Sequence, residues 1–283
     1  PGIFIHSAGY NTNRITIRGM GSRSPYSTNK IKAYLNNIPL TNGVGELTME
    51  DYGLDIINQI EVVKGPNSSI YGSGLGGNIL LKTEKLTEKF IKINSSYKSF
   101  NTFQNRVSLS KRINKIDLFV NLEKLKSDGY RENNTYENTR LFGSLDYHIN
   151  DYININIIQF ITDVEALIPS SLSLDDYKNS PTNAAFSWKN IKGGENYSHS
   201  LTGVSINTNK LNYSSNTSLF YKFFENSELR PFNYLTEDSK SFGARHSGKF
   251  VMKKSSIIYG FEINNEDYHF DTWDDYDGFI GQN

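Results

Sequence analysis

The sequence predicts an incomplete all-β membrane barrel that follows a small mixed α/β domain. Three observations lead to this fold class. Aromatic residues make up 13% of the chain although hydrophobic residues make up only 37%, the second part alternates apolar with polar residues, and its connections alternate in length. Strands with one wet face and one apolar face need aromatic side chains and moderate polarity, without long apolar runs.

The overall composition excludes several other classes of protein. Lys+Arg and Asp+Glu number 30 each, so the formal net charge is zero and no basic field indicates nucleic-acid binding. The chain has no cysteine, which excludes disulfide frameworks, thiolate metal sites and cysteine nucleophiles. No stretch approaches the roughly 20 apolar residues of a membrane helix. Membrane strands give a weaker hydropathy signal, so this absence does not exclude a membrane β-barrel.

The front domain, which we place at residues 1–86, is rich in glycine and short apolar runs. Its candidate strands, each bounded by Gly, Pro, Asn or Ser, are Arg14–Arg18, Ile31–Leu35, Ile57–Lys64 and Asn78–Thr83. The best helical candidate is one or two turns at Asp51–Ile56. These features predict a small mixed domain with long loops.

Residues 87–283 alternate with the period of a strand. Leu118, Val120 and Leu122, for example, alternate with Phe119, Asn121 and Glu123. We count about nine such segments of roughly ten residues, which is the length of a tilted transmembrane strand. A bacterial barrel needs an even number of strands, so an odd count predicts a barrel that is incomplete here.

The connections between these segments give the barrel its direction. Short polar turns are predicted at Arg112–Lys115, Asn150–Asp151, Asn207–Lys210 and Lys253–Ser256, and long loops at Lys126–Asn138, Asp163–Asn196 and Asn226–Ser239. Short periplasmic turns and long extracellular loops are typical of outer-membrane barrels. The segment near Ile91–Tyr97 should then run outward, and the chain should stop at Asn283 in an extracellular loop. A secreted β-sandwich or propeller remains the alternative on this pattern alone.

Four segments of the front domain carry a family resemblance. They are RITIRGMGSR (14–23), IKAYLNNIPL (31–40), INQIEVVKGP (57–66) and IYGSGLGGNIL (70–80). Together and in this order they resemble the plug domain of TonB-dependent outer-membrane receptors, in the branch that imports ferric citrate and siderophores. The structural positions of these motifs are Gly19, Gly65, Pro66, Gly72, Gly76 and Gly77. A nucleotide-binding glycine loop is disfavoured, because these glycines precede a strand and open no helix.

The resemblance implies a plugged barrel of roughly 22 strands that imports a scarce nutrient into the periplasm without chemistry on it. Its partner would be the TonB–ExbB–ExbD energy-coupling complex, reached through an N-terminal segment that this chain lacks. The sequence shows no signal peptide and begins abruptly at Pro1, so we expect it to start inside a domain. The resemblance predicts location in the outer membrane of a Gram-negative bacterium, no enzymatic activity and no cofactor, with iron present only as part of the transported chelate.

Two apical loops are implied to meet the ligand by their position relative to the motifs. The candidate ligand-binding residues are Arg23, Tyr26, Ser27, Thr28, Asn29 and Glu46. Arg23 could bind the oxygens of an anionic chelate bidentately, or it could pair with a barrel carboxylate. Arg18 and Lys64 are implied to lock the plug to the barrel through acidic partners that lie partly outside this chain.

The sequence gives little support for a metal site, a hydrolase or a calcium-binding loop. The five histidines (His6, His148, His199, His246 and His269) have no metal-ligand spacing. A hydrolase with His148 or His246 as base would have no plug motifs in front of it. The acidic run Asp271–Asp277 lacks the spacing of a calcium loop and is interpreted as a solvated loop. The loop Asp163–Asn196, which carries Trp188, is expected to cover the barrel mouth.

The sequence leaves the cargo open. Uptake of cobalamin, haem or an oligosaccharide by the same machinery is the alternative to a ferric chelate. A surface barrel that transports nothing is a third reading, and it would need no energy-coupling segment.

Overall fold

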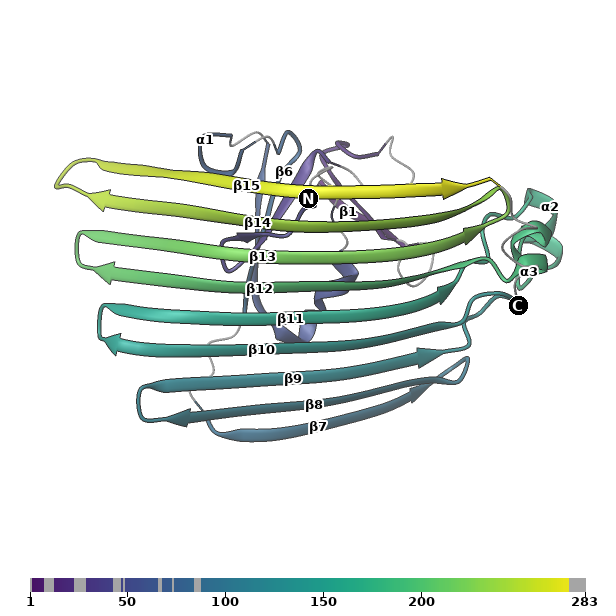
Figure 1. The fold of residues 1–283 in the computed structure, drawn as a ribbon, viewed down its shortest axis with the longest axis horizontal. Helices are drawn as coiled ribbons and strands as arrows, with labels where there is room; N and C mark the ends of the chain where they lie inside the picture. The colour runs from purple at the N-terminus through teal and green to yellow at the C-terminus, as the bar shows by residue number, and fades with distance from the viewer. Residues whose placement is uncertain are drawn as a thin grey trace.

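The structure is a computed structural model that describes residues 2–7, 13–22, 29–42, 47, 49–65, 68–72, 74–83 and 88–274. In this part of the chain a nine-stranded sheet, the wall sheet, runs β7 to β15 in sequence order, every strand antiparallel to its neighbours. The strands are β7 (Phe90–Lys98), β8 (Thr102–Ile113), β9 (Ile116–Ser127), β10 (Tyr136–Asn150), β11 (Ile153–Leu167), β12 (Gly194–Lys210), β13 (Tyr213–Arg230), β14 (Asn233–Val251) and β15 (Ser256–Trp273). Figure 1 shows them as one curved meander. The predicted set of about nine strands is confirmed.

The front domain lies against one face of the wall sheet (Figure 1). It contains a four-stranded sheet in the order β4-β3-β6-β5 and a separate ribbon of β1 and β2. Its elements are β1 (Ile3–Ser7), β2 (Asn13–Ile17), β3 (Ile31–Leu35), β4 (Ile38–Pro39), the 3-10 helices η1 (Met49–Tyr52) and η2 (Leu54–Ile56), β5 (Ile57–Lys64), the helix α1 (Ser68–Tyr71) and β6 (Gly77–Thr83). β3 and β5 have the predicted bounds, and the predicted helical turns are η1 and η2.

The connections differ in part from the prediction. β13 ends at Arg230 and β14 begins at Asn233, so the loop predicted at Asn226–Ser239 is wrong: it is a hairpin with a two-residue connection. The turn predicted at Asn207–Lys210 is also wrong in place, because β12 continues to Lys210. Asn207–Lys210 is polar throughout and Asn226–Ser239 is mostly polar, which weakens the alternation that the sequence prediction relied on. Their backbone groups nevertheless pair across the sheet.

The strands β12 to β15 are much longer than the roughly ten residues predicted, at 17, 18, 19 and 18 residues. On the outer face of β13 the exposed apolar residues Leu219 and Tyr221 give way to Glu225 and Ser227 toward the loops. About 9–11 residues suffice to cross a bilayer. The apolar band therefore covers only the half of these strands near the short turns, and the rest projects beyond it.

The two remaining long connections lie at one edge of the wall sheet, as predicted. The helices α2 (Leu174–Asn179) and α3 (Phe186–Ile191) fold in the connection between β11 and β12 at this edge (Figure 1). Arg131, from the loop after β9, donates to the carbonyls of Asn183 and Ser170 at 2.8 and 2.6 Å. This arginine ties the two loops into one unit. Coverage of the barrel mouth by this unit stays a prediction. No helix in the described ranges is long and apolar enough to span a membrane.

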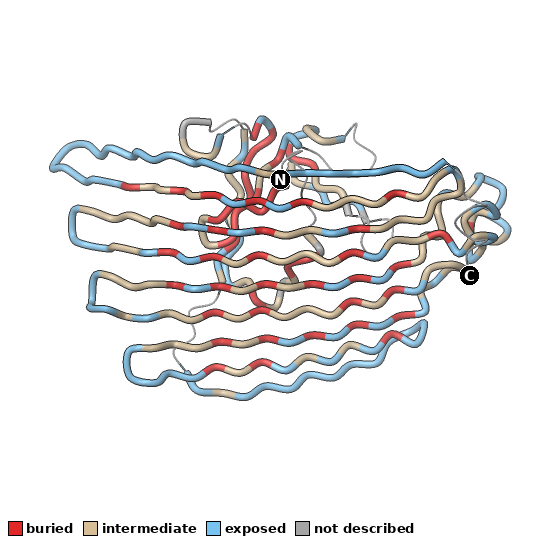
Figure 2. Tube along the Cα trace, viewed as in Figure 1, coloured by how far each residue is buried: buried red, intermediate tan, exposed pale blue. Residues whose placement is uncertain are grey.

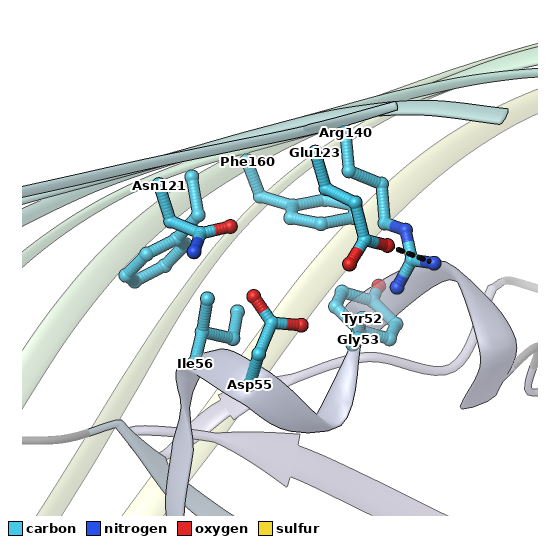
Figure 3. A pocket seen from close by; sticks show the side chains of 9 residues that line it. Tyr52, Gly53, Asp55, Ile56, Asn121, Glu123, Arg140 and Phe160 are labelled. Carbon is cyan, nitrogen blue, oxygen red and sulfur yellow. Dashed lines mark ion pairs between the residues drawn. The ribbon is translucent and has the colours of Figure 1, made fainter. Parts of the chain in front are cut away.

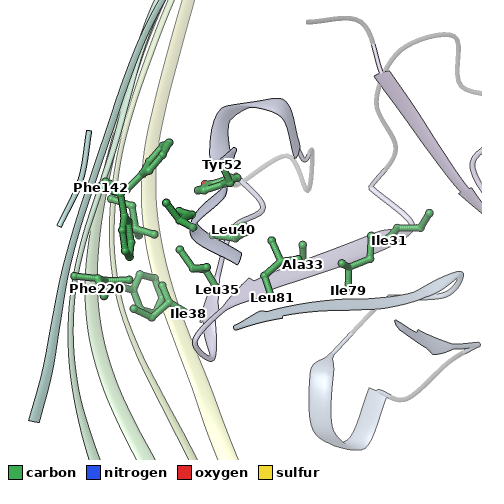
Figure 4. Packing of buried hydrophobic residues seen from close by; sticks show 14 of the residues in the cluster. Ile31, Ala33, Leu35, Ile38, Leu40, Tyr52, Ile79, Leu81, Phe142 and Phe220 are labelled. Carbon is green, nitrogen blue, oxygen red and sulfur yellow. The ribbon is translucent and has the colours of Figure 1, made fainter. Parts of the chain in front are cut away.

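The main apolar core joins the front domain to the wall sheet. Figure 2 shows buried positions alternating along the wall strands, and Figure 4 shows Leu35 and Ile38 facing Phe142 and Phe220 of the wall. Gly203 on β12 makes room for this contact, since a Cβ there would lie 2.3 Å from Cδ1 of Ile38. The hairpin between β3 and β4 is therefore the point of the front domain that is inserted against the wall.

The turn of that hairpin is made by Asn36 and Asn37, both at positive φ (48° and 76°). Asparagine accepts this left-handed geometry better than most residues, so it replaces glycine here. The side chain of Asn36 also bonds Thr83 twice, through Nδ2 to the hydroxyl at 2.8 Å and through Oδ1 from the backbone N–H at 3.0 Å. The hairpin is thereby fastened to the end of β6.

Candidate functional site

The candidate site is the polar interface between the front domain and the wall sheet, and Arg245 of β14 lies at its centre. Its side chain is buried and donates from Nε to Oδ1 of Asn37 at 3.0 Å and from Nη2 to the carbonyl of Ile70 at 2.8 Å. Nη1 pairs with Glu262 on the neighbouring strand β15. The guanidinium also lies 4.5 Å from the ring centroid of Tyr34. One wall residue thus holds β3, the β3–β4 turn and α1 together.

Buried tyrosines of the front domain surround these contacts as neutral groups. Burial, with the nearby carboxylate of Glu262, raises the pKa of Tyr34, whose hydroxyl donates to the carbonyl of Tyr71 at 2.9 Å. Burial and then Asp51 raise the pKa of Tyr52. Both phenols therefore remain protonated at neutral pH and act as hydrogen-bond donors or apolar rings rather than as charges.

A second contact is made by Asp51, which is almost fully buried in η1. Tyr197 of β12 donates its hydroxyl to Oδ1 at 2.7 Å, and Nδ1 of His199 lies 3.0 Å from Oδ2. The adjacent Tyr52 packs against Phe160 of β11 with ring centroids 4.8 Å apart. Burying a carboxylate without partners costs on the order of several kcal/mol. The two partners of Asp51 offset that cost.

A third contact is a network of four charges, of which Asp55, Glu123 and Arg140 line a cavity of about 10 Å³ (Figure 3). Asp55 of η2 is the only member from the front domain, and its Oδ2 lies 3.1 Å from Nε of Arg106 without hydrogen-bond geometry. Arg106 also pairs with Glu123, and Nη2 of Arg140 lies 2.6 Å from Oε1 of Glu123. Gly53, at φ 41°, leaves space for Arg140, because a Cβ would lie 2.4 Å from its Nη1.

Three further hydrogen bonds cross the interface. Lys222 of β13 is buried and donates to the carbonyl of Thr41 at 2.7 Å. Nδ2 of Asn37 donates to Oδ1 of Asn216 at 2.7 Å and to the hydroxyl of Ser247 at 3.2 Å. In these contacts the cations come from the wall sheet, and the front domain supplies carboxylates, carbonyls and amides.

Most residues predicted to bind ligand lie outside the described residues: Arg23, Tyr26, Ser27, Thr28 and Glu46, together with the motif residue Pro66. Asn29 is exposed in the turn before β3. The structure therefore leaves the ligand role of this group as a prediction.

The two predicted locking residues are both exposed on the front domain. Arg18 follows β2 at φ 49°, and its backbone N–H donates to the carbonyl of Gly2 at 2.7 Å. Lys64 is the last residue of β5. Their pairing with acidic barrel residues stays a prediction, whereas the described contacts run in the opposite sense, with cations on the wall.

The motif glycines organise the end of the front-domain sheet. Gly65 donates its N–H to the carbonyl of Gly76 at 3.2 Å, and Gly76 donates to Lys30 at 2.8 Å. At Gly77, where φ is 135°, a Cβ would lie 2.4 Å from the carbonyl oxygen of Val63. Gly19 and Gly72 also have positive φ, at 80° and 67°. Close backbone approach is the reason for glycine at position 77.

Sequence reasoning missed the residues that hold the interface. Arg106, Glu123, Arg140 and Arg245 occupy inward positions of their strands, and each has an apolar residue on one side in the sequence. A charged residue at an inward position of a barrel strand is therefore the sequence signal that could have identified these anchoring residues. Across the described ranges, no group of three or more His, Asp or Glu side chains could hold a metal ion.

This geometry defines a class of protein, a barrel wall with a separate domain packed on its inner face. Residues 1–78 match the family described as TonB-dependent Receptor Plug Domain. Over these residues the front domain is similar to that plug, and it is called the plug below; the wall sheet is part of the barrel around it. The predicted fold class is confirmed, and the sandwich or propeller alternative is wrong.

Solved structures have the same fold. The ferric yersiniabactin uptake receptor FyuA from Yersinia pestis matches with a TM-score of 0.79 and 14% identity, over 96% of this chain and 45% of that one. The ferric citrate transporter FecA, unliganded, matches with 0.77 and 17% identity, over 96% and 44%. The copper transporter OprC matches with 0.76 and 12% identity, over 96% and 44%. The chain thus spans less than half the length of these structures.

Proposed function

We propose that this chain is part of an outer-membrane transporter that imports a ferric chelate into the periplasm with energy from the TonB–ExbB–ExbD complex. The observation that carries the proposal is the plug itself, which is held to the wall sheet by several separate polar contacts beside the apolar contact of the β3–β4 hairpin. Such contacts can be exchanged for water one at a time. A gate that must open and reseat needs this kind of interface.

The wall residues are arranged so that opening leaves few buried charges without partners. Arg245 retains Glu262, and Arg106 retains Glu123, when the plug contacts to Asn37 and Asp55 are lost. An orphaned buried charge costs about 3–5 kcal/mol, and these wall pairs avoid that cost. The plug can therefore leave and return against a prearranged wall.

The ferric chelate is favoured by the resemblance of the plug motifs, including Gly65-Pro66, to the iron-chelate branch. Similarity of fold to FyuA and FecA agrees with it, and the similarity to the copper transporter OprC shows that one fold serves different cargo. Iron would be cargo, with no resident cofactor and no catalysis. Cobalamin, haem or an oligosaccharide are the alternative cargo, and a surface barrel that transports nothing is the alternative class.

The test uses the full-length receptor purified from outer membranes. Tryptophan and tyrosine fluorescence is followed while ferric citrate and a panel of ferric siderophores are added. Saturable quenching by an iron chelate, weakened by Arg23→Ala, supports both the cargo and the apical-loop assignment. A response to cobalamin, haem or a glycan alone would replace the cargo, and uptake of labelled iron that persists without TonB would refute energy coupling.

A further inference from the structure

Glu237 is an inward carboxylate of β14 on the loop side of the plug contacts. It shares its face with Arg245, which lies eight residues nearer the short turn, a separation of about 26 Å along the strand. In the register it stands opposite Asn226 of β13 and Phe270 of β15. On β12, the residue opposite Asn226 is Tyr197, which bonds the plug residue Asp51. Glu237 therefore faces the barrel interior just beyond the plug.

The partners of Glu237 are neutral. Asn226 donates from Nδ2 to Oε1 at 3.0 Å, and Tyr268 donates its hydroxyl to Oε2 at 2.7 Å. Asn226 is only 8% exposed, and its Oδ1 accepts no hydrogen bond. Among the described residues no cation pairs with Glu237. This stretch of wall thus presents a negative charge and an unused amide acceptor to the interior.

The charged groups on the neighbouring strands leave that charge uncompensated. Arg230 pairs with Glu228, and Lys222 is committed to the carbonyl of Thr41. Glu266 adds a second carboxylate to the same face, and its Oε2 is buried without a hydrogen bond, although Ser239 donates to Oε1.

Aromatic rings frame the carboxylate of Glu237. The rings of Tyr268 and Phe270 lie 6.0 Å apart, centroid to centroid, on the same face of β15. A carboxylate beside aromatic faces is the combination that binds ammonium and guanidinium groups, by ion pairing and by cation–π attraction.

We propose that Glu237, Tyr268 and Phe270, here called the cation patch, bind a positively charged group on the imported chelate. This inference rests on the proposed function, and it narrows the cargo to ferric chelates that carry an ammonium or guanidinium group. The same patch disfavours a polyanion such as ferric citrate, because Glu237 repels it. The cationic group enters the barrel interior beside the plug.

The experiment compares two ligands that differ by one charge, on the full-length receptor. Ferrioxamine B, a ferric tris-hydroxamate with a free ammonium group, is titrated against its N-acetylated form, and dissociation constants are measured by tryptophan and tyrosine fluorescence. A charge-assisted contact predicts about 10- to 100-fold tighter binding of the cationic form. Glu237→Gln should bring the ratio close to one. Glu225→Gln, at an exposed position on the outer face of β13, is the matched control and should leave the ratio unchanged.

Each outcome either supports or overturns the cation patch. Equal binding of the two forms by the unaltered receptor, or a ratio that survives Glu237→Gln, overturns the cation patch while the import of iron chelates stands. Binding of no iron chelate at all overturns the proposed function and this inference with it. Should Glu237→Gln fail to fold, judged by heat-dependent migration on gels, Phe270→Leu is used instead. It should reduce the preference for the cationic form several-fold, and an unchanged ratio refutes the patch.

Discussion

Replacing Arg245 by alanine should release the plug from the wall sheet. The substitution removes two hydrogen bonds to the plug, the cation–π contact with Tyr34 and the charge that compensates Glu262. Hydrogen bonds from a charged donor contribute about 1.5–3 kcal/mol each. Because the loss also leaves a partly buried carboxylate alone, we expect the seating of the plug to weaken by about 3–5 kcal/mol.

Hydrogen exchange of the full-length receptor measures this loss locally. Since about 1.4 kcal/mol is a factor of ten, backbone amides of the β3–β4 hairpin and α1 should exchange roughly 100- to 4000-fold faster. Arg245→Lys keeps the charge but not the fork of donors, so it should give an intermediate rate. Lys249→Ala, at an exposed position on the same face of β14, is the control. Unchanged exchange in Arg245→Ala would refute the anchoring role.

Two further predictions concern packing and pH. Gly203→Val should force its side chain onto Ile38 and destabilise the seated plug by about 1–3 kcal/mol, seen as faster exchange of the hairpin, whereas Gly143→Ala has no atom within 4 Å of its Cβ and should change nothing. Equal effects of both would contradict the contact. The hydrogen bond from Lys189, at 2.7 Å, lowers the pKa of Glu132 in the loop after β9. Because the pKa of Glu132 is lower in the folded protein, its ion pair stabilises the folded loops at pH values above the pKa of the unfolded chain. This stabilisation is lost as the pH falls through the pKa of the folded protein. Amides of α3 should therefore exchange faster in acid, and Lys189→Ala should abolish that pH dependence; a pH response that survives the substitution would assign it elsewhere.

Local structure was readable from the sequence where one physical signal acted alone. β3 was predicted correctly because five apolar-rich residues, Ile31–Leu35, lie between polar turn residues and are buried on both faces. The β13–β14 hairpin was not, because Ser227, Glu228 and their neighbours lie beyond the apolar band, where neither face needs to be hydrophobic. Strand pairing there is set by backbone bonds and cross-strand contacts, which leave no periodic signature.

The anchoring residues could not be paired from the sequence for a different reason. Asp51 and Tyr197 are 146 positions apart, and Asn37 and Arg245 are 208 apart. Each pair depends on the register of several strands and on how deep the hairpin is inserted. A one-residue slip in any strand would turn its inward charge toward lipid. The sequence therefore shows which residues face inward, but not which residues they contact.

The wall cations Arg245, Arg106 and Lys222 differ in what each loses when the plug leaves. Arg245 and Arg106 keep wall carboxylates after the plug leaves, so their release costs only the plug-side bonds. Lys222 differs, because its hydrogen bond is to the carbonyl of Thr41, and Glu262 and Glu266 act on it only through space. When the plug withdraws, this lysine exchanges its hydrogen bond for water. Lys222→Met removes one hydrogen bond to the plug, and it also removes the cost of burying a cation. We therefore expect it to weaken the seating of the plug only slightly, although Lys222 is buried. Exchange of amides around Thr41 should rise by less than in Arg245→Ala, and the reverse order would show that Lys222 is the principal anchor.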